Sequence, residues 1–382
     1  MTAPLFTPVS LRDVALRNRV VIPPMCQYSA AGGMAGDYHL VHYGRLALGG
    51  AGLVILEATA VVPEGRITHG DLGIWSDAHG AALARIAAFL KAHGAAAGVQ
   101  LAHAGRKASM QRPWEGNGPL SAEEIARGEA PWPIVAPSAV PLDEGWLMPA
   151  ELSGDDLDAL TEAFVAAARR AEAAGFDVIE LHAAHGYLLH TFLSPLTNRR
   201  EDAFGGDRTG RMRFPLRVAR ALREAWPAGK PLFVRVSAVD GLEGGITLDD
   251  TLAFAGELRA LGVDVLDCSS GGLAGSATAA RIRRDYGFQV GFAEAVKRET
   301  GLSTMAVGLI VDPRQADAIV AEGRADLVAV GREALADPNW AVRASRVLDG
   351  TQEPGFEAWP QQAGWWLERR ENDIARLGPW RA

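Results

Sequence analysis

The residues of this sequence best suited to chemistry are two histidines and a tyrosine that follow an apolar run. The run 178–181 reads as a buried strand, and it stops at His182, His185, Gly186 and Tyr187; a core strand does not need such a polar cluster for packing. Neutral imidazoles can donate hydrogen bonds to a substrate oxygen, and a phenol can supply a proton, so the cluster could polarise and protonate a small molecule. Two other interpretations stay open at this point, because His-x-x-His is also a possible zinc pair and histidines at a strand end can be purely structural.

Composition restricts the class of protein. The 382 residues suit two ordinary domains or one α/β barrel with insertions, and the formal net charge of −8 argues against a nucleic-acid partner. Cys26 and Cys268 are the only cysteines, so a disulfide framework is not expected. The N-terminal residues show no secretion signal, and no apolar stretch reaches the roughly 20 residues of a membrane helix. We therefore expect a cytoplasmic enzyme with no membrane partner.

Strands and helices are predicted to alternate along the whole chain. The predicted strands are 18–26, 51–58, 98–103, 178–181, 232–236, 263–268, 303–307 and 327–330, and the predicted helices are 39–48, 77–93, 153–174, 211–225, 248–261, 291–299, 313–322 and 338–348. Strict alternation with buried strands implies parallel pairing and right-handed crossovers. Eight such units predict a closed (β/α)8 TIM barrel forming one domain. An open doubly wound sheet would usually carry a Gly-x-Gly-x-x-Gly turn after its first strand, where this chain has residues 23–26, PPMC.

Two segments stand outside this alternation. The excursion 108–149, after the third strand, is rich in proline and contains Trp114, Trp132 and Trp146, a content that favours a lid over a plain surface loop. The C-terminal extension 350–382 contains three tryptophans within the eight residues 359–366. Because tryptophan side chains gain free energy from burial, this extension is expected to pack on its own barrel or on another subunit.

A barrel would bring many of the polar residues together. In this fold the active site lies at the C-terminal ends of the strands, which predicts that the following residues converge: Met25, Cys26, Ala60, Gln100, His182, His185, Tyr187, Arg235, Gly308, Gly331 and Arg332. The glycines after the last two strands allow backbone N–H groups to approach a phosphate, and Arg332 adds a charged hydrogen-bond donor.

A phosphorylated cofactor near Gln100 and Arg235 suggests flavin mononucleotide (FMN). A glutamine amide can pair with the pyrimidine edge of the isoalloxazine ring, and an arginine can stabilise negative charge on the reduced ring. The sequence therefore predicts an FMN site formed by the strand ends.

Five motifs together carry a resemblance to a known family. They are residues 23–28 (PPMCQY), 57–60 (EATA), 100–107 (QLAHAGRK), 182–187 (HAAHGY) and 331–333 (GRE). They resemble the Old Yellow Enzyme family of flavin-dependent ene-reductases, in particular its bacterial "thermophilic-like" branch, which includes xenobiotic reductases and an NADPH dehydrogenase with a cysteine near the flavin. The resemblance extends from about residue 5 to about residue 366.

The resemblance implies a reaction and a role for each matching residue. NADPH or NADH reduces FMN, which then passes a hydride to the β-carbon of an α,β-unsaturated carbonyl or related activated alkene. His182 and His185 hold the substrate carbonyl, Tyr187 protonates the α-carbon, Cys26 tunes the flavin potential, and Tyr28 contacts the substrate. No metal is implied.

The remaining expectations concern flavin packing and assembly. Met25 and Pro24 lie against the flavin, Ala60 contributes backbone groups, and Pro23 offers a backbone contact where relatives often have Ser or Thr. The branch also implies a homodimer or homotetramer built from two-fold dimers, with Trp366, or less readily Arg369, bordering the partner's substrate pocket. Two alternatives are kept open: a zinc-dependent hydrolase using His182 and His185, and a flavin-binding protein without turnover.

Overall fold

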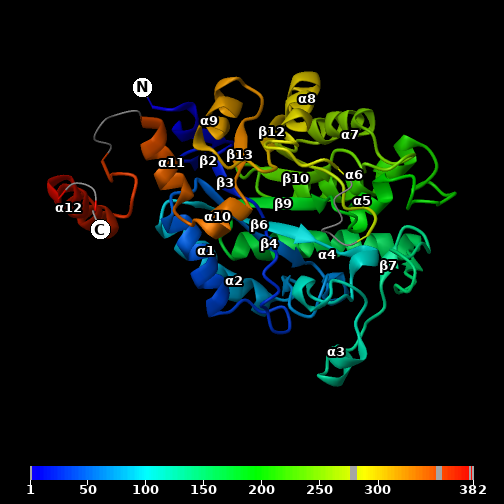
Figure 1. The fold of residues 1–382 in the computed structure, drawn as a ribbon. Coiled ribbons are helices and arrows are strands. Elements are labelled where there is room, and N and C mark those ends of the chain that lie inside the picture. The colour runs from blue at the N-terminus through cyan, green and yellow to red at the C-terminus, as the bar shows by residue number, and fades with distance from the viewer. Residues whose placement is uncertain (1, 276–281, 350–354, 378–379, 381–382) are drawn as a thin grey trace.

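Eight parallel strands form a closed barrel in the computed structural model, which describes residues 2–275, 282–349, 355–377 and 380 (Figure 1). Each strand pairs with the next along the chain, and the last pairs with the first. In chain order they are β3 (Val20–Ile22), β4 (Leu53–Ala60), β6 (Ala96–Ala102), β9 (Val178–Ala183), β10 (Leu232–Ser237), β11 (Val265–Ser269), β12 (Ser303–Ala306) and β13 (Leu327–Ala329). The predicted (β/α)8 barrel is confirmed.

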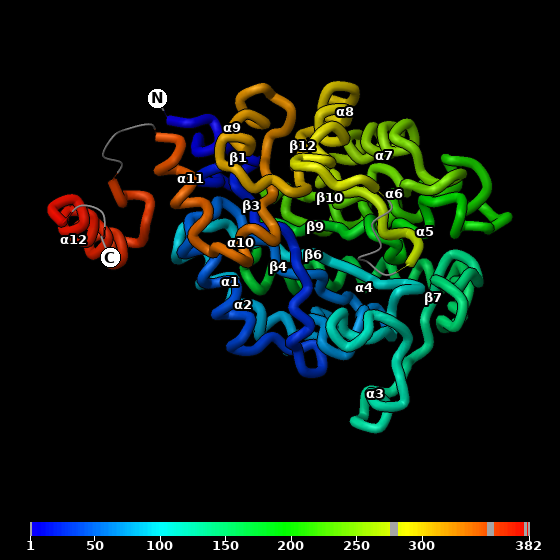
Figure 2. Tube along the Cα trace, in the orientation of Figure 1, coloured from blue at the N-terminus to red at the C-terminus, as the bar shows by residue number. Residues whose placement is uncertain are grey.

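A helix from each unit covers the outside of the barrel, as the trace in Figure 2 shows. These helices are α1 (Asp37–Leu48), α2 (Asp77–Ala92), α4 (Gly154–Ala173), α6 (Arg208–Ala225), α7 (Leu248–Ala260), α8 (Val290–Thr300), α9 (Pro313–Ala321) and α11 (Trp340–Asp349). Their boundaries follow local chemistry. Ser153, for example, accepts a hydrogen bond from the Asp156 N–H at 3.2 Å and so caps α4, as its sequence predicts.

The barrel interior changes from apolar to polar along its axis. At the N-terminal end a hairpin of β1 (Val9–Leu11) and β2 (Val14–Leu16) packs against inward-facing strand residues such as Leu53 and Phe233. Nearer the C-terminal strand ends, charged and amide side chains face inward instead: Gln100, Glu180, Arg235 and Asp267, all buried. The polar layer lies below the barrel end where the active site is expected.

Several short elements were not predicted. They are the hairpin β1–β2, the additional strands β5 (Leu72–Gly73), β7 (Val135–Ala136) and β8 (Ala150–Glu151), the helices α3 (Ala122–Ala126), α5 (Leu188–Leu193), α10 (Arg332–Ala336) and α12 (Gln361–Leu377), and the 3-10 turns Pro4–Phe6, Pro63–Gly65, Gly105–Lys107 and Pro113–Glu115. Of these, α10 begins at the predicted site residue Arg332, and α5 begins directly after the predicted site residue Tyr187. None of the helices in the described ranges is long and apolar enough to span a membrane.

The excursion and the extension both leave the compact barrel. Helix α3 of the excursion protrudes from the body, and α12 lies apart from it, beyond α11 (Figures 1 and 2). The expected extension begins at residues 350–354, which lie outside the described residues, so its structural account starts at residue 355.

Candidate active site

The turn after β9 positions the predicted catalytic residues. His185 has a left-handed backbone with φ of 61°, which is uncommon outside glycine, and Gly186 follows with φ of 76°. A Cβ on Gly186 would lie 2.4 Å from the Gly272 carbonyl oxygen, so only glycine fits this close approach. The His185 N–H donates to Ser237 Oγ at 2.9 Å, which ties the turn to β10. Neighbouring residues thus hold the strained backbone of this turn, which places the imidazole of His185 and the phenol of Tyr187 on the same side of the barrel end.

A buried hydrogen bond between a histidine of α5 and an aspartate supports the same turn. The Gly186 N–H donates to Nδ1 of His190 at 2.7 Å, and Nε2 of that histidine lies 2.8 Å from a carboxylate oxygen of Asp240. Asp240 also accepts hydrogen bonds from Ser194 Oγ and the Ile246 N–H. These contacts satisfy the buried polar side chains of His190, Ser194 and Asp240, which lie next to the predicted site.

The two site histidines are neutral, and a backbone hydrogen bond defines the tautomer of His182. Burial lowers the pKa of both imidazoles well below the usual value, and the positive charge of Arg235 lowers it further. His182 Nδ1 accepts a hydrogen bond from the Ala184 N–H at 3.2 Å, so the proton of this ring is on Nε2. That Nε2 lies 3.4 Å from His185 Nδ1, and His185 Nε2 lies 2.7 Å from Ser269 Oγ. Neutral N–H groups of this kind can donate to a carbonyl oxygen without a proton being transferred.

Tyr187 lies against His182 with ring centroids 4.8 Å apart. Burial raises the pKa of the Tyr187 phenol well above its ordinary value, and the carboxyl of Asp71 adds to this effect. The phenol therefore keeps its proton throughout the working pH range and can donate it to a carbanion-like centre.

Lys107 completes this group, although sequence reasoning gave it no role. Its Nζ donates to the backbone carbonyls of His185, at 2.9 Å, and Gly272, and it lies 5.9 Å from the Tyr187 ring centroid. Burial lowers the pKa of Lys107 to about 7, with a smaller contribution from Arg106. The side chain joins the turn after β9 to the loop after β11.

A cavity of about 360 Å³ opens beside these residues. Among the predicted residues, the following line it: Pro23, Pro24, Met25, His185, Arg235, Gly308, Gly331 and Arg332. Others that line it were not predicted, among them Ser269, Phe288 and Gln289. The volume falls within the usual range of small-ligand sites.

The residues of this cavity fit a flavin phosphate and ring. Gly308 and Gly331 follow the adjacent strands β12 and β13 and line the cavity with Arg332, whose guanidinium makes no hydrogen bond or ion pair with any described residue. An unpaired guanidinium beside two glycines suits a phosphate. Arg235 of β10 and His185 of the turn after β9 also line the cavity, and beside them a ring that gains negative charge on reduction would be stabilised.

Gln100 and Ala60 do not line this cavity. The Gln100 amide nitrogen donates to Glu180 at 2.8 Å, which leaves its second amide proton and its carbonyl oxygen for the predicted contact with the pyrimidine edge. Ala60 is buried at the end of β4, where its carbonyl accepts the Ile74 N–H at 2.9 Å. Their predicted roles toward FMN stay predictions.

Cys26 and Tyr28 lie on a loop that Glu57 holds in place. The Glu57 carboxylate accepts hydrogen bonds from the Gln27 N–H and the Tyr43 hydroxyl, both at 2.8 Å. Burial raises the pKa of the Cys26 thiol well above its ordinary value, and the carboxyls of Asp71 and Glu57 raise it further. Cys26 is therefore a neutral thiol, and not a reactive thiolate.

Cys26 does not itself line the cavity, so its predicted contact with the flavin stays a prediction. If the contact exists, replacing Cys26 with serine or alanine is expected to shift the midpoint potential of bound flavin, because a polarisable sulfur beside the ring is lost or exchanged. The check is a spectroelectrochemical titration of the purified holoenzymes. Cys268→Ser serves as the matched control, since Cys268 is buried on β11 and its thiol faces the Leu266 carbonyl at 3.7 Å. A potential unchanged at Cys26 would show that the thiol does not contact the flavin.

The excursion forms part of the pocket wall. Tyr28, Lys107 and Tyr187 line a small second cavity together with excursion residues Met110, Gln111, Pro113, Asn117 and Leu142. Trp114 packs edge-on against Tyr28, with ring centroids 5.7 Å apart. The start of the excursion therefore lines a cavity next to Tyr187.

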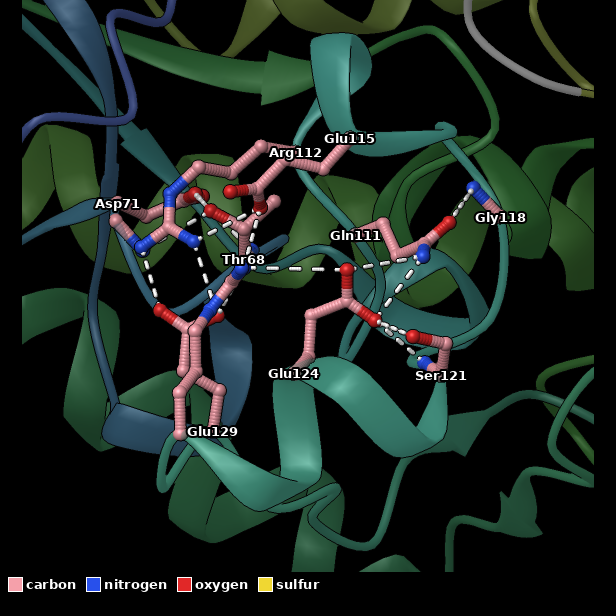
Figure 3. A network of polar contacts seen from close by, with 11 residues as sticks. Thr68, Asp71, Gln111, Arg112, Glu115, Gly118, Ser121, Glu124 and Glu129 are labelled. Carbon is pink, nitrogen blue, oxygen red and sulfur yellow. Dashed lines mark hydrogen bonds and ion pairs between the residues drawn. The ribbon is translucent and has the colours of Figure 1, made fainter.

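A network of hydrogen bonds and ion pairs stabilises this part of the excursion (Figure 3). Arg112 donates to both carboxylate oxygens of Glu129, at 2.9 and 2.7 Å, and to Glu115 at 3.1 Å. Gln111 donates to Glu124 at 3.0 Å, and Glu124 in turn accepts the Ser121 N–H at 2.7 Å. A bidentate arginine–carboxylate pair within a network fixes geometry better than isolated surface pairs do.

Trp366 is the predicted site residue that the single chain does not bring to the site. It lies on α12, apart from the barrel, with 68% of its surface exposed. The zinc interpretation also lacks support, because within the described ranges no group of three His, Cys, Asp or Glu side chains could hold a metal ion.

Comparison with known proteins agrees with this site. Residues 4–350 match the model of the NADH:flavin oxidoreductase / NADH oxidase family. The chain is 44% identical to an NADPH dehydrogenase of Geobacillus sp. (strain WCH70) over 92% of this chain and 96% of that one. It is 46% identical to an NADPH dehydrogenase of Listeria monocytogenes serotype 4a (strain HCC23), over 91% and 96%. The structure of morphinone reductase superposes with a TM-score of 0.75 at 29% identity, covering 90% of each chain.

These matches cover nearly the whole barrel, and the residues at the strand ends fit the cofactor of such enzymes. They confirm FMN as the cofactor and NAD(P)H as the reductant, and they confirm the resemblance to the Old Yellow Enzyme family. The chain belongs to the NADH:flavin oxidoreductase / NADH oxidase family and is an NAD(P)H-dependent flavin oxidoreductase.

Proposed function

We propose that this flavin oxidoreductase is an ene-reductase, which reduces the carbon–carbon double bond of α,β-unsaturated carbonyl compounds and related activated alkenes. The observation that carries the proposal is the grouping of two neutral imidazoles and a protonated phenol beside the flavin cavity. Neutral donors suit a carbonyl oxygen, and the phenol supplies the one proton that the reduction of an alkene needs in addition to a hydride.

Bound FMN supplies the hydride chemistry, taking a hydride from NAD(P)H and giving one to the alkene. His182 Nε2–H and an N–H of His185 donate to the substrate carbonyl and so draw electron density from the double bond. Tyr187 Oη delivers a proton to the α-carbon, and Lys107 keeps the turn that carries His185 in position. Arg235 stabilises negative charge near the cofactor, and Tyr28 packs against the substrate beside Trp114.

The excursion 108–149 acts in this proposal as the outer wall of the substrate pocket. Its residues line the cavity next to Tyr187, and the network around Arg112 holds them there. The wall would thus set the size of alkene that is accepted.

The extension is proposed to complete the site of a second copy in a homodimer or in a homotetramer built from two-fold dimers. Helix α12 presents exposed apolar side chains, among them Trp365, Trp366, Ile374 and Leu377, and an unpartnered face of this kind indicates a protein interface. A two-fold axis would let each copy receive the other's helix. Arg369 stacks on Trp365, 3.1 Å from the ring centroid, so Trp366 remains the better candidate for the partner's pocket.

Anaerobic reduction and reoxidation test the function. NADPH is expected to bleach the flavin, and cyclohexenone, a maleimide or a nitroalkene is expected to restore its absorbance with formation of the saturated product, measured by chromatography. Reoxidation by oxygen with none by any alkene would contradict the ene-reductase proposal while leaving the family assignment intact. Failure of both NADPH and NADH to bleach the flavin would instead favour a flavin-binding protein without turnover.

A further inference from the structure

Four side chains form a buried cluster inside the barrel, below the flavin cavity. Gln100, Glu180, Arg235 and Asp267 come from the adjacent strands β6, β9, β10 and β11. In the parallel register Gln100 lies beside Glu180 and Arg235 beside Asp267. Both carboxyl groups belong to residues with no exposed surface, and only Arg235 reaches the cavity. We call these four residues the barrel-interior cluster.

The formal charges of the barrel-interior cluster do not balance. The four residues hold two carboxyl groups and one guanidinium; Arg235 Nε lies 3.0 Å from an oxygen of Asp267, and the guanidinium acts on Glu180 through its charge. Glu180 Oε1 accepts a hydrogen bond from Gln100, but among the described residues neither Glu180 Oε2 nor either oxygen of Asp267 has a hydrogen-bond partner. A fully buried carboxylate with an unpartnered oxygen is costly, and protonation removes the cost.

The surroundings of Glu180 favour its protonated form. Burial is the largest cause and the negative charge of Asp267 the next, and together they raise the pKa of Glu180 to about 8 against the opposing effect of Arg235 and Gln100. The adjacent histidine on its own strand, His182, is neutral and supplies no compensating charge. Burial also raises the pKa of Asp267, although Arg235 opposes it.

We propose that Glu180 and Asp267 share a single proton, and that this proton sets the net charge which the barrel-interior cluster presents to the flavin through Arg235. With the proton the cluster is neutral, since one carboxylate offsets one guanidinium. Without it the cluster carries one net negative charge, and in a poorly solvated interior such a charge acts over several ångströms. The inference rests on FMN binding and is independent of the ene-reductase proposal.

A redox consequence follows from charge alone. Reduction adds negative charge to the cofactor and therefore raises the proton affinity of Glu180. By the same linkage, loss of this proton lowers the midpoint potential of the flavin. The proton, bound or released at the Glu180 carboxyl, comes from or goes to solvent, and no further reactant is needed.

The test is the midpoint potential of the holoenzyme between pH 6 and pH 9.5, for the wild type and for Glu180→Gln. If reduction changes the proton affinity of Glu180 tenfold, the wild-type potential falls by about 30 mV more than that of the variant across this range, by the conversion for a two-electron couple. Glu162→Gln, an exposed glutamate on α4, is the control and should follow the wild type. Parallel curves for the wild type and Glu180→Gln would overturn the proposal.

Asp267→Asn provides a second, independent measurement. This substitution removes the negative charge that raises the pKa of Glu180 and leaves the positive charge of Arg235, which lowers it. The extra fall in midpoint potential should therefore occur at lower pH. An unmoved step would also overturn the proposal. Loss of flavin colour in every variant including Glu162→Gln would point instead to a fault in the FMN assignment.

Unfolding of the apoprotein gives a readout without cofactor. The folded-state pKa of Glu180 is raised to about 8, above the unfolded value near 4.3, so the folded protein binds the extra proton between these values. Its stabilising contribution is complete below about pH 4.3 and is lost as the pH rises toward 8. The variant Glu180→Gln has no such proton to lose. Its unfolding temperature minus that of the wild type should therefore be larger at pH 8 than at pH 5. An equal difference at both pH values would refute a proton held at Glu180.

Discussion

Tyr187→Phe is expected to slow the reduction of an enone by the FMN-loaded enzyme by about 10²- to 10⁴-fold, the range usual for loss of a positioned general acid. Flavin reduction by NADPH should stay within about twofold of the wild-type rate, because hydride transfer to the flavin does not need the phenol. The ring itself is retained, so packing against His182, 4.8 Å away, is preserved. The two half-reactions therefore separate the loss of a proton donor from damage to the pocket.

Anaerobic stopped-flow measurements of each half-reaction provide the check. Tyr286→Phe, at a tyrosine with 76% of its surface exposed, is the matched control. Because the pKa of Tyr187 is raised well above 10, the wild-type rate of enone reduction should show no fall from phenol ionisation up to about pH 10. An equal loss in both half-reactions of Tyr187→Phe would contradict the role of proton donor.

Local patterns were sufficient to predict the barrel. Each of the eight strands is a short apolar run whose ends carry glycine, proline or polar residues, and each outer helix has an apolar face and a local start or stop signal such as Ser153. These signals are independent of distant parts of the chain. The convergence of His185, Arg235 and Arg332 on one cavity then follows from the fold, because parallel strands all end on the same side.

What the sequence did not reveal depends on contacts between distant residues or on single backbone angles. The left-handed conformation of His185 is set by Ser237 and Lys107, which are 52 and 78 residues away. Glu180 and Asp267 did carry a signal, since each is an acid within an otherwise apolar strand. Only the structure shows that Asp267 pairs with Arg235 and that Glu180 is buried near enough to feel the charges of both. Short helices such as α5 have too few residues for a periodic pattern to be recognised.

The C-terminal extension is the least predictable part, because its position depends on surfaces beyond its own sequence. Trp359 packs near Phe356, with ring centroids 6.2 Å apart, and Arg346 of α11 lies over the Phe356 ring. The aromatic residues before α12 thus contact the last barrel helix. The tryptophans of α12 itself remain exposed in the single chain, which is the observation that makes the extension testable.

Truncation before Trp359 is expected to weaken the proposed dimer and to raise KM for the proposed enone substrates, while FMN stays bound. Burial of one large aromatic side chain is worth roughly 1.5–3 kcal/mol, so losing even one buried tryptophan per subunit should weaken dimerisation by at least about tenfold. The cavity residues that fit FMN all precede residue 334, so the cofactor contacts do not depend on the extension. Sedimentation velocity over a concentration series, absorbance of bound flavin, and steady-state kinetics with cyclohexenone measure the three effects.

Two point variants separate assembly from the shared pocket. Trp366→Ala should raise KM for the enone with a smaller effect on dimerisation, because this side chain is proposed to enter the partner's site. Ile374→Ala, at an exposed position on the same helix, is the matched control and should leave KM unchanged. A truncated protein that keeps the wild-type oligomeric state and enone kinetics would show that each barrel works alone, and an Ile374→Ala variant with the same KM defect as Trp366→Ala would show that α12 acts only through assembly.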